Sequence, residues 1–139
     1  LGLRPQAPPE QRKGKASYFL DDHDPEEIRR TMHDAGLDIE IVASHGRYLD
    51  ILARGVGKHA AVLHVAEALG MTQSQVVVAG DSGNDRAMLR ACPHPIIVGN
   101  WSDGLGDDPA LSHAYMASAT HAGGVLEGVR HYSEAGHWQ

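Results

Sequence analysis

The sequence predicts an α/β fold: a parallel sheet with helices, preceded by a smaller unit of antiparallel strands and one helix. Two continuously apolar runs, at 76–79 and 95–98, are typical of parallel strands buried on both faces. Both alternate with segments of helical composition, which is typical of a parallel sheet. Upstream of these runs the pattern changes to short strands joined by turns. We therefore divide the chain into residues 1–54 and residues 55–139.

The first part begins with the Pro-rich, polar residues 1–14, which we expect to form a loop. Asp24 followed by Pro25 and two glutamates predicts the start of a helix, because an acidic cap and a first-turn proline are favoured there. Gly36 predicts its end. Ser44 to Arg47 is expected to be a hairpin turn. The predicted strands are 15–20, 38–43 and 48–52.

The second part contains apolar residues at helical spacing from Lys58 to Leu69, and Gly70 is expected to cap that helix. A short edge strand is expected at 114–117. The other predicted elements are strands at 76–79 and 95–98 and helices at 84–91 and 122–132.

Composition narrows the classes of function. The 139 residues carry a net charge of −6 without a basic run, which argues against nucleic-acid binding. No apolar stretch reaches the length of a membrane span, so we expect no membrane contact. The single cysteine, Cys92, fits a reducing cytoplasm. Among the ten histidines no pair has the i, i+4 spacing of a zinc helix, and we interpret them as structural or surface residues. Trp101 and Trp138 are interpreted as loop or terminal packing.

The most informative motif, Gly80-Asp81-Ser82-Gly83-Asn84-Asp85, directly follows the 76–79 strand. Ligands of open α/β sheets bind beyond the carboxyl ends of strands. Two carboxylates in a tight loop suit Mg²⁺, which completes its shell with water and phosphate oxygens. The alternative is an Asp/Gly-rich turn with one aspartate as a helix cap, but a cap does not need two acids, an asparagine and two glycines.

Lys58 begins a helix after Gly55-Val56-Gly57, where an ammonium could neutralise a phosphoryl group. A lysine is also an ordinary helix residue. The segment is not a Walker A loop, because Leu52 and His59 stand where that motif needs Gly and Ser or Thr.

Together, Lys58 and GDSGND after a buried strand resemble the third and fourth motifs of haloacid dehalogenase (HAD) phosphatases. The chain is more closely similar to sucrose-6-phosphate phosphatases and to the phosphatase-like C-terminal domain of bacterial sucrose-phosphate synthases. The segments that carry this resemblance are SYFLD (17–21), SHGRYLDIL (44–52), GVGKHAAV (55–62), VVVAGDSGNDRAML (76–89), IIVGN (96–100) and AGGVLEGVRHY (122–132). The chain departs from the family pattern at Ala53, where proline is usual, and at 101–105, where a Glu-Leu pair is expected after Gly-Asn.

The resemblance implies that residues 55–139 form the C-terminal half of a Rossmann-like HAD core and residues 1–54 part of an α+β cap. It implies that Asp81 binds Mg²⁺, and that Asp85 supports the metal or orients Lys58. Lys58 and Asn84 would hold the phosphoryl group. The residues expected near the sugar are Ser44, His45, Arg47, Asp50 and Asn100.

The family's nucleophilic Asp-x-Asp pair lies upstream of the cap, so we expect these 139 residues to lack it and to show little hydrolysis alone. Asp22 and Asp24 form a similar pair after an apolar strand. Because Glu26 stands where the family has Thr or a similar residue, and because helix-start chemistry explains the acids, we assign this pair to the cap.

The resemblance implies a Mg²⁺-dependent phosphomonoesterase that hydrolyses sucrose 6-phosphate or a similar sugar phosphate. The alternatives are a non-catalytic, phosphatase-like module of a sucrose-phosphate synthase and, third, a sugar-phosphate-binding fragment. The expected partners are the sugar phosphate and the remainder of the same polypeptide, with its upstream core half and possibly a glycosyltransferase domain. We expect a cytoplasmic location.

Overall fold

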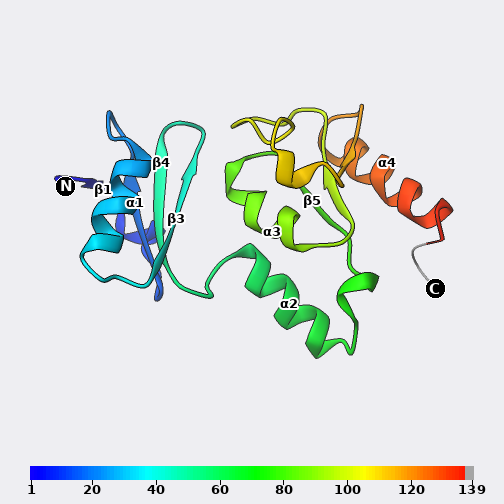
Figure 1. Ribbon diagram of the computed structural model, residues 1–139, viewed down its shortest axis with the longest axis horizontal. Coiled ribbons are helices and arrows are strands. Elements are labelled where there is room, and N and C mark those ends of the chain that lie inside the picture. Colours follow the sequence, from blue (N-terminus) through cyan, green and yellow to red (C-terminus); the bar gives the residue numbers. More distant parts are fainter. Residues whose placement is uncertain (137–139) are drawn as a thin grey trace. The chain divides into compact units, whose positions relative to one another are not determined.

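The computed structural model describes residues 1–136, so Trp138 lies outside the described residues (Figure 1). The chain divides into two compact units, Leu1–Gly57 and Lys58–Gln139. The expected boundary after residue 54 lies three residues earlier. Among the described residues, no helix is both long and apolar enough to cross a membrane.

The first unit is a four-stranded antiparallel sheet with the order β1-β2-β4-β3. Its elements are β1 (Arg4–Pro5), a 3₁₀ turn (Pro8–Glu10), β2 (Lys15–Phe19), α1 (Pro25–Asp34), β3 (Ile39–Ser44) and β4 (Tyr48–Ala53). The expectation that residues 1–14 form only a loop was wrong at β1, which pairs with β2 from Arg4↔Phe19. A proline is tolerated there because β1 is an edge strand, where one side of the backbone needs no ladder partner.

Helix α1 covers one face of this sheet, where Ile28 packs with Leu49 and Ile41 in a buried cluster. The predicted start of α1 is confirmed, since the Asp24 side chain accepts a hydrogen bond from the Glu26 backbone N–H at 2.9 Å. The predicted hairpin is confirmed as well: Arg47 N–H donates to the Ser44 carbonyl at 3.1 Å.

The second unit contains a three-stranded parallel sheet with the order β5-β6-β7, as predicted. Its helices and strands are α2 (Lys58–Ala68), β5 (Val78–Gly80), α3 (Arg86–Ala91), β6 (Pro95–Ile97), β7 (Tyr115–Met116) and α4 (His121–Glu134). Short 3₁₀ turns lie at Gln73–Gln75, Gly83–Asp85 and Pro109–Leu111.

Two elements begin two residues later than predicted. The strand expected at 76–79 begins at Val78, because Val76 still closes the preceding 3₁₀ turn through its N–H to the Gln73 carbonyl. The helix expected from Asn84 begins at Arg86, since residues 83–85 form a tighter turn around the Asp85 side chain.

Adjacent residues of β6 join different apolar clusters. Ile97 packs with Leu89 and Leu105, whereas Ile96 packs with Tyr132 of α4. Helix α4 lies so close to β6 that a Cβ on Gly128 would stand 2.5 Å from the Ile96 side chain. This packing holds the carboxyl ends of the strands, from which the candidate site is built.

Candidate active site

The loop after β5 folds around one buried carboxylate. Asp85 is 5% exposed, and its Oδ2 accepts hydrogen bonds from the backbone N–H groups of Asp81 at 3.0 Å and Ser82 at 3.4 Å. A Cβ on Gly80 would stand 2.5 Å from the Asp85 Cβ. Glycine is therefore required at position 80 by a close approach, and Asp85 holds the shape of the loop.

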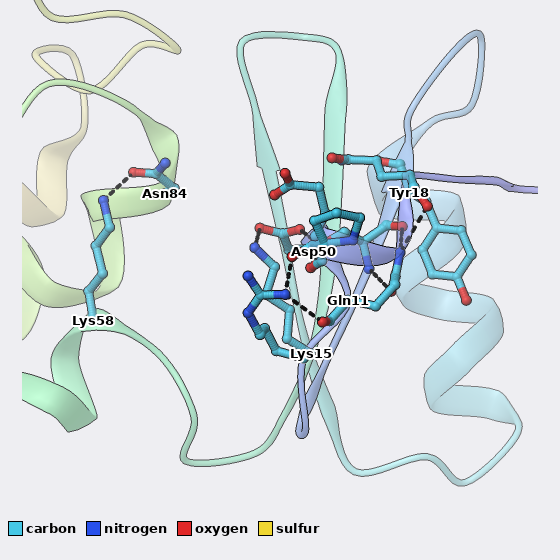
Figure 2. A network of polar contacts seen from close by, with 11 residues as sticks. Gln11, Lys15, Tyr18, Asp50, Lys58 and Asn84 are labelled. Atoms are coloured by element: carbon cyan, nitrogen blue, oxygen red, sulfur yellow. Dashed lines mark hydrogen bonds and ion pairs between the residues drawn. The ribbon is translucent and has the colours of Figure 1, made fainter.

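Lys58, the first residue of α2, reaches this loop from the same unit. Its Nζ lies 2.5 Å from Asp85 Oδ1 and donates to Asn84 Oδ1 at 2.8 Å, a contact seen in Figure 2. The lysine side chain remains 51% exposed while its carboxylate partner is buried. The three predicted residues Lys58, Asn84 and Asp85 thus meet, with the ammonium open to a ligand.

Asp81 differs from Asp85 in how its carboxylate is used. Both Asp85 oxygens are occupied by the contacts above, whereas the carboxylate of the half-buried Asp81 accepts a long hydrogen bond of 3.4 Å from Asn100 Nδ2. Among residues 1–136, no three His, Cys, Asp or Glu side chains are grouped so as to hold a metal. A lone protein carboxylate still fits Mg²⁺, which keeps several waters and takes one or two carboxylates.

Residues 101–105, noted above for their departure from the family pattern, belong to a loop after β6 that closes over Asp81, a role that the sequence did not predict. Ser102 N–H donates to the Asp81 carbonyl at 2.7 Å, and Asp103 Oδ2 accepts from Gly83 N–H at 3.0 Å. The guanidinium of Arg86 in turn donates to the Asp103 carbonyl at 2.6 Å. Only the short Ser-Asp-Gly sequence at 102–104 marked this loop, and such a sequence is typical of any turn.

Asp108 anchors the far end of that loop to α3. It is buried and ion-paired with Arg86 and, at 2.6 Å, with Arg90, and it caps the turn at Ala110 N–H. Burial acts to raise the pKa of Asp108, but the hydrogen bonds from Arg90, Ala110 and Arg86 outweigh it and hold the pKa below its ordinary value.

Four of the residues expected near the sugar belong to the first unit. Ser44 ends β3, His45 occupies the turn with φ 53°, and the Arg47 guanidinium lies 5.3 Å from the Tyr48 ring centre. Asp50 is engaged within its own sheet by two contacts, Ser17 Oγ at 2.6 Å and Lys15 Nζ at 2.8 Å (Figure 2). The fifth, Asn100, lies in the second unit beside Asp81.

Of the Asp22 and Asp24 pair, Asp24 has the helix-start role expected for it. Asp24 caps α1, and Asp22 is exposed in the turn before it.

This chain is similar in sequence to known proteins. A family model described as sucrose-6F-phosphate phosphohydrolase matches residues 1–133. The mannosylfructose-phosphate phosphatase of Agrobacterium fabrum is 37% identical over 126 residues, which cover 85% of this chain and 50% of the relative. The probable sucrose-phosphatase 2 of Arabidopsis thaliana is 31% identical over 147 residues, covering 94% of this chain and 34% of that protein.

Among solved structures, the sucrose-phosphatase of Synechocystis sp. PCC6803, in complex with sucrose and phosphate, matches with a TM-score of 0.85 and 33% identity. The match covers 94% of this chain and 57% of that one. A HAD subclass IIB sugar phosphatase matches with a TM-score of 0.68 and 19% identity, over 86% of this chain and 43% of the other, which shows the shared fold. The chain therefore spans between about a third and just over half of these relatives.

Proposed function

Because this chain belongs to the sucrose-6F-phosphate phosphohydrolase family, we propose that it supplies the cation- and phosphate-binding loop of a sugar-phosphate phosphatase. The observation that carries the proposal is the meeting of Lys58, Asn84 and Asp85 at the carboxyl end of β5, in the loop that also carries Asp81. In open α/β sheets this edge is where ligands bind.

Each residue has a role that its contacts support. Lys58 is held by Asp85 with half of its side chain exposed, so its ammonium is oriented and can offset negative charge on a phosphoryl group. Asn84 can donate its amide N–H₂ to a phosphate oxygen while its Oδ1 accepts from Lys58. Of the two roles expected for Asp85, its contacts favour orienting Lys58 over binding a metal.

Asp81 is the residue that would hold Mg²⁺. When bound, the cation would supply positive charge to the phosphate oxygens. The chain's own contribution is to fix the Asp81 backbone through Asp85 and Ser102, so that the carboxylate needs little rearrangement to bind.

The proposed substrate is sucrose 6-phosphate or a similar disaccharide phosphate. This proposal is supported by the names of the relatives, a mannosylfructose-phosphate phosphatase and sucrose-phosphatases. Sugar contacts by Ser44, His45, Arg47 and Asp50 remain part of it. A cytoplasmic location is also proposed, on the single cysteine, which is buried.

The remainder of the same polypeptide is the proposed partner of an apolar groove of about 490 Å³ along α2 and β5. Its lining includes Val65 and Leu69, which are 55% and 68% exposed, and β5 is the terminal strand of its sheet among the described residues. An exposed edge beside an apolar surface favours addition of a strand. Amide exchange in β5 should be slower in the protein at its natural length than in these 139 residues, and equal exchange would contradict this partner.

The non-catalytic module, as part of a sucrose-phosphate synthase, is less favoured. The Lys58 ammonium is oriented by two side chains yet left open, an arrangement that a purely structural ion pair does not need.

The proposal is tested by phosphate release from sucrose 6-phosphate by the protein at its natural length. Release should require Mg²⁺, and Asp81→Ala should abolish it while leaving the melting temperature within a few degrees of the wild type, since Asp81 is half-buried and makes one long side-chain contact. Wild-type turnover in Asp81→Ala would reject the metal assignment.

A further inference from the structure

We infer that Asn100 is a positioning residue that fixes the carboxylate of Asp81; this inference rests on the proposed function of Asp81 as the cation ligand. Asn100 follows β6 and Gly99, at the same edge of the sheet as the loop after β5. Its side-chain amide bridges two elements. Nδ2 donates to Asp81 Oδ2 at 3.4 Å, and Oδ1 accepts from the His121 backbone N–H at 2.7 Å.

The second contact determines the direction of the amide. A backbone N–H can only donate, so it must face the oxygen of the Asn100 side chain. The N–H₂ group is then turned toward the Asp81 carboxylate, which can only accept when ionised. The orientation of Asn100 therefore follows from the network itself, and the long contact to Asp81 has the correct polarity.

The start of α4 supplies independent support. His121 has φ 52°, a left-handed conformation that is unfavourable for a residue with a Cβ, and such conformations persist where the surroundings require them. The N–H of His121, the first residue of α4, has no partner within the helix, and the Asn100 side chain accepts its hydrogen bond. The strained turn thus delivers a backbone donor to the residue that faces Asp81.

The rest of Asp81 is held from the same side. Its carbonyl accepts from Ser102 N–H at 2.7 Å and its N–H donates to Asp85 at 3.0 Å, so the backbone is fixed at both ends. The side-chain torsions are the remaining freedom, and Asn100 restricts them. Asn100 was expected to contact the sugar, but its amide oxygen and one amide N–H already have partners within the protein, which favours positioning.

The test compares Mn²⁺ affinity, measured by electron paramagnetic resonance, in the wild-type protein at its natural length and in its Asn100→Leu variant. Leucine keeps the size of the side chain and removes both hydrogen bonds. Removing a partner that orients a metal ligand typically weakens affinity by about 10–100-fold, and we expect a loss of about tenfold. Affinities are compared at a temperature at which both proteins give folded amide NMR spectra, so that lost stability alone cannot produce the effect.

A control variant separates positioning from general damage to the loop. Asp107→Ala, in the same loop after β6, should keep wild-type affinity, because Asp107 is exposed and the substitution retains its backbone N–H, which donates to the Gly104 carbonyl. Equal Mn²⁺ affinity in Asn100→Leu and wild type would overturn this inference and leave the proposed function standing. Absence of Mn²⁺ binding in the wild type would reject both.

Discussion

The described residues contain two Lys–Asp pairs of similar length, and the difference between them explains why only one is proposed as part of a site. Lys58 and Asp85 are 2.5 Å apart, and Lys15 and Asp50 are 2.8 Å apart. In the first pair the Asp85 side chain is 7% exposed and the Lys58 side chain 51%, so the positively charged partner is the more exposed one. In the second pair the Asp50 side chain is 28% exposed and the Lys15 side chain 32%, so neither partner is clearly more exposed than the other.

The surroundings of the two pairs also differ. Asp50 accepts a hydrogen bond from Ser17 Oγ in the middle of an antiparallel sheet, where Ser17 and Asp50 face each other across β2 and β4. The Lys58–Asp85 pair lies instead at the carboxyl end of the parallel strand β5, in the loop that folds around Asp85. Ion pairing alone therefore does not distinguish the two lysines; the role proposed for Lys58 rests on its orientation by a buried acid at a strand end.

Replacing the two lysines should produce the largest contrast. Lys58→Met should lower kcat for phosphate release by about 10²–10³-fold in the protein at its natural length, because an oriented charge at the reacting phosphate is lost. Lys15→Met is the matched control and should leave kcat nearly unchanged, since its partner Asp50 is held by Ser17. Equal losses of kcat in both variants would contradict the comparison.

Neutralising the two acids should separate them by stability. Asp85→Asn should reduce the free energy of unfolding by about 1–3 kcal/mol, because a buried carboxylate that accepts from two backbone amides is lost. Asp50→Asn should cost about 1 kcal/mol or less, because its ion pair is partly exposed and the amide oxygen can still accept from Ser17. Urea denaturation followed by NMR signals of each unit measures both values. A larger loss in the free energy of unfolding for Asp50→Asn than for Asp85→Asn would contradict the assignment of Asp85 as the more strongly stabilising carboxylate.

Acid should weaken the loop that closes over Asp81. The folded pKa of Asp108 is lowered, so its stabilising contribution is present above the ordinary carboxyl pKa of about 4 and is lost as pH falls through the folded value. The difference in melting temperature between wild type and Asp108→Asn should be largest near neutral pH and shrink below about pH 4. A difference in melting temperature that does not change with pH would show that the contacts of Asp108 with Arg86 and Arg90 do not stabilise the fold through the Asp108 charge.

Local patterns in the sequence predicted the parts of the fold that local chemistry determines. Asp24 before Pro25 predicted the helix start because the cap lies two residues from the N–H that it accepts. The apolar run before Gly80 predicted a parallel strand and hence the place of the acidic loop. Strand β1 escaped prediction because two residues have no measurable period, and its pairing partner is Phe19, far along the chain.

Contacts between distant residues decided the rest of the candidate site. The motif placed Asp81 and Asp85 in one loop, and only the family resemblance gave them different roles. The physical difference between them arises because the fold brings Lys58 and two backbone amides onto Asp85. The bridge from Asn100 to Asp81 joins residues 19 apart, and no spacing rule relates them. Asp50 had no local signal for its partner Ser17, which lies 33 residues away.

The most direct measurement is a map of the amide NMR signals of the 139-residue chain that Mn²⁺ at substoichiometric concentration broadens. We predict that Mn²⁺ broadens the amide signals of Gly80, Asp81 and Ser82 most strongly, and that this broadening is lost in Asp81→Ala. Broadening centred on Asp50, or on the exposed Asp22 beside α1, with Gly80 to Ser82 unaffected, would contradict the assignment of the loop after β5 as the cation site.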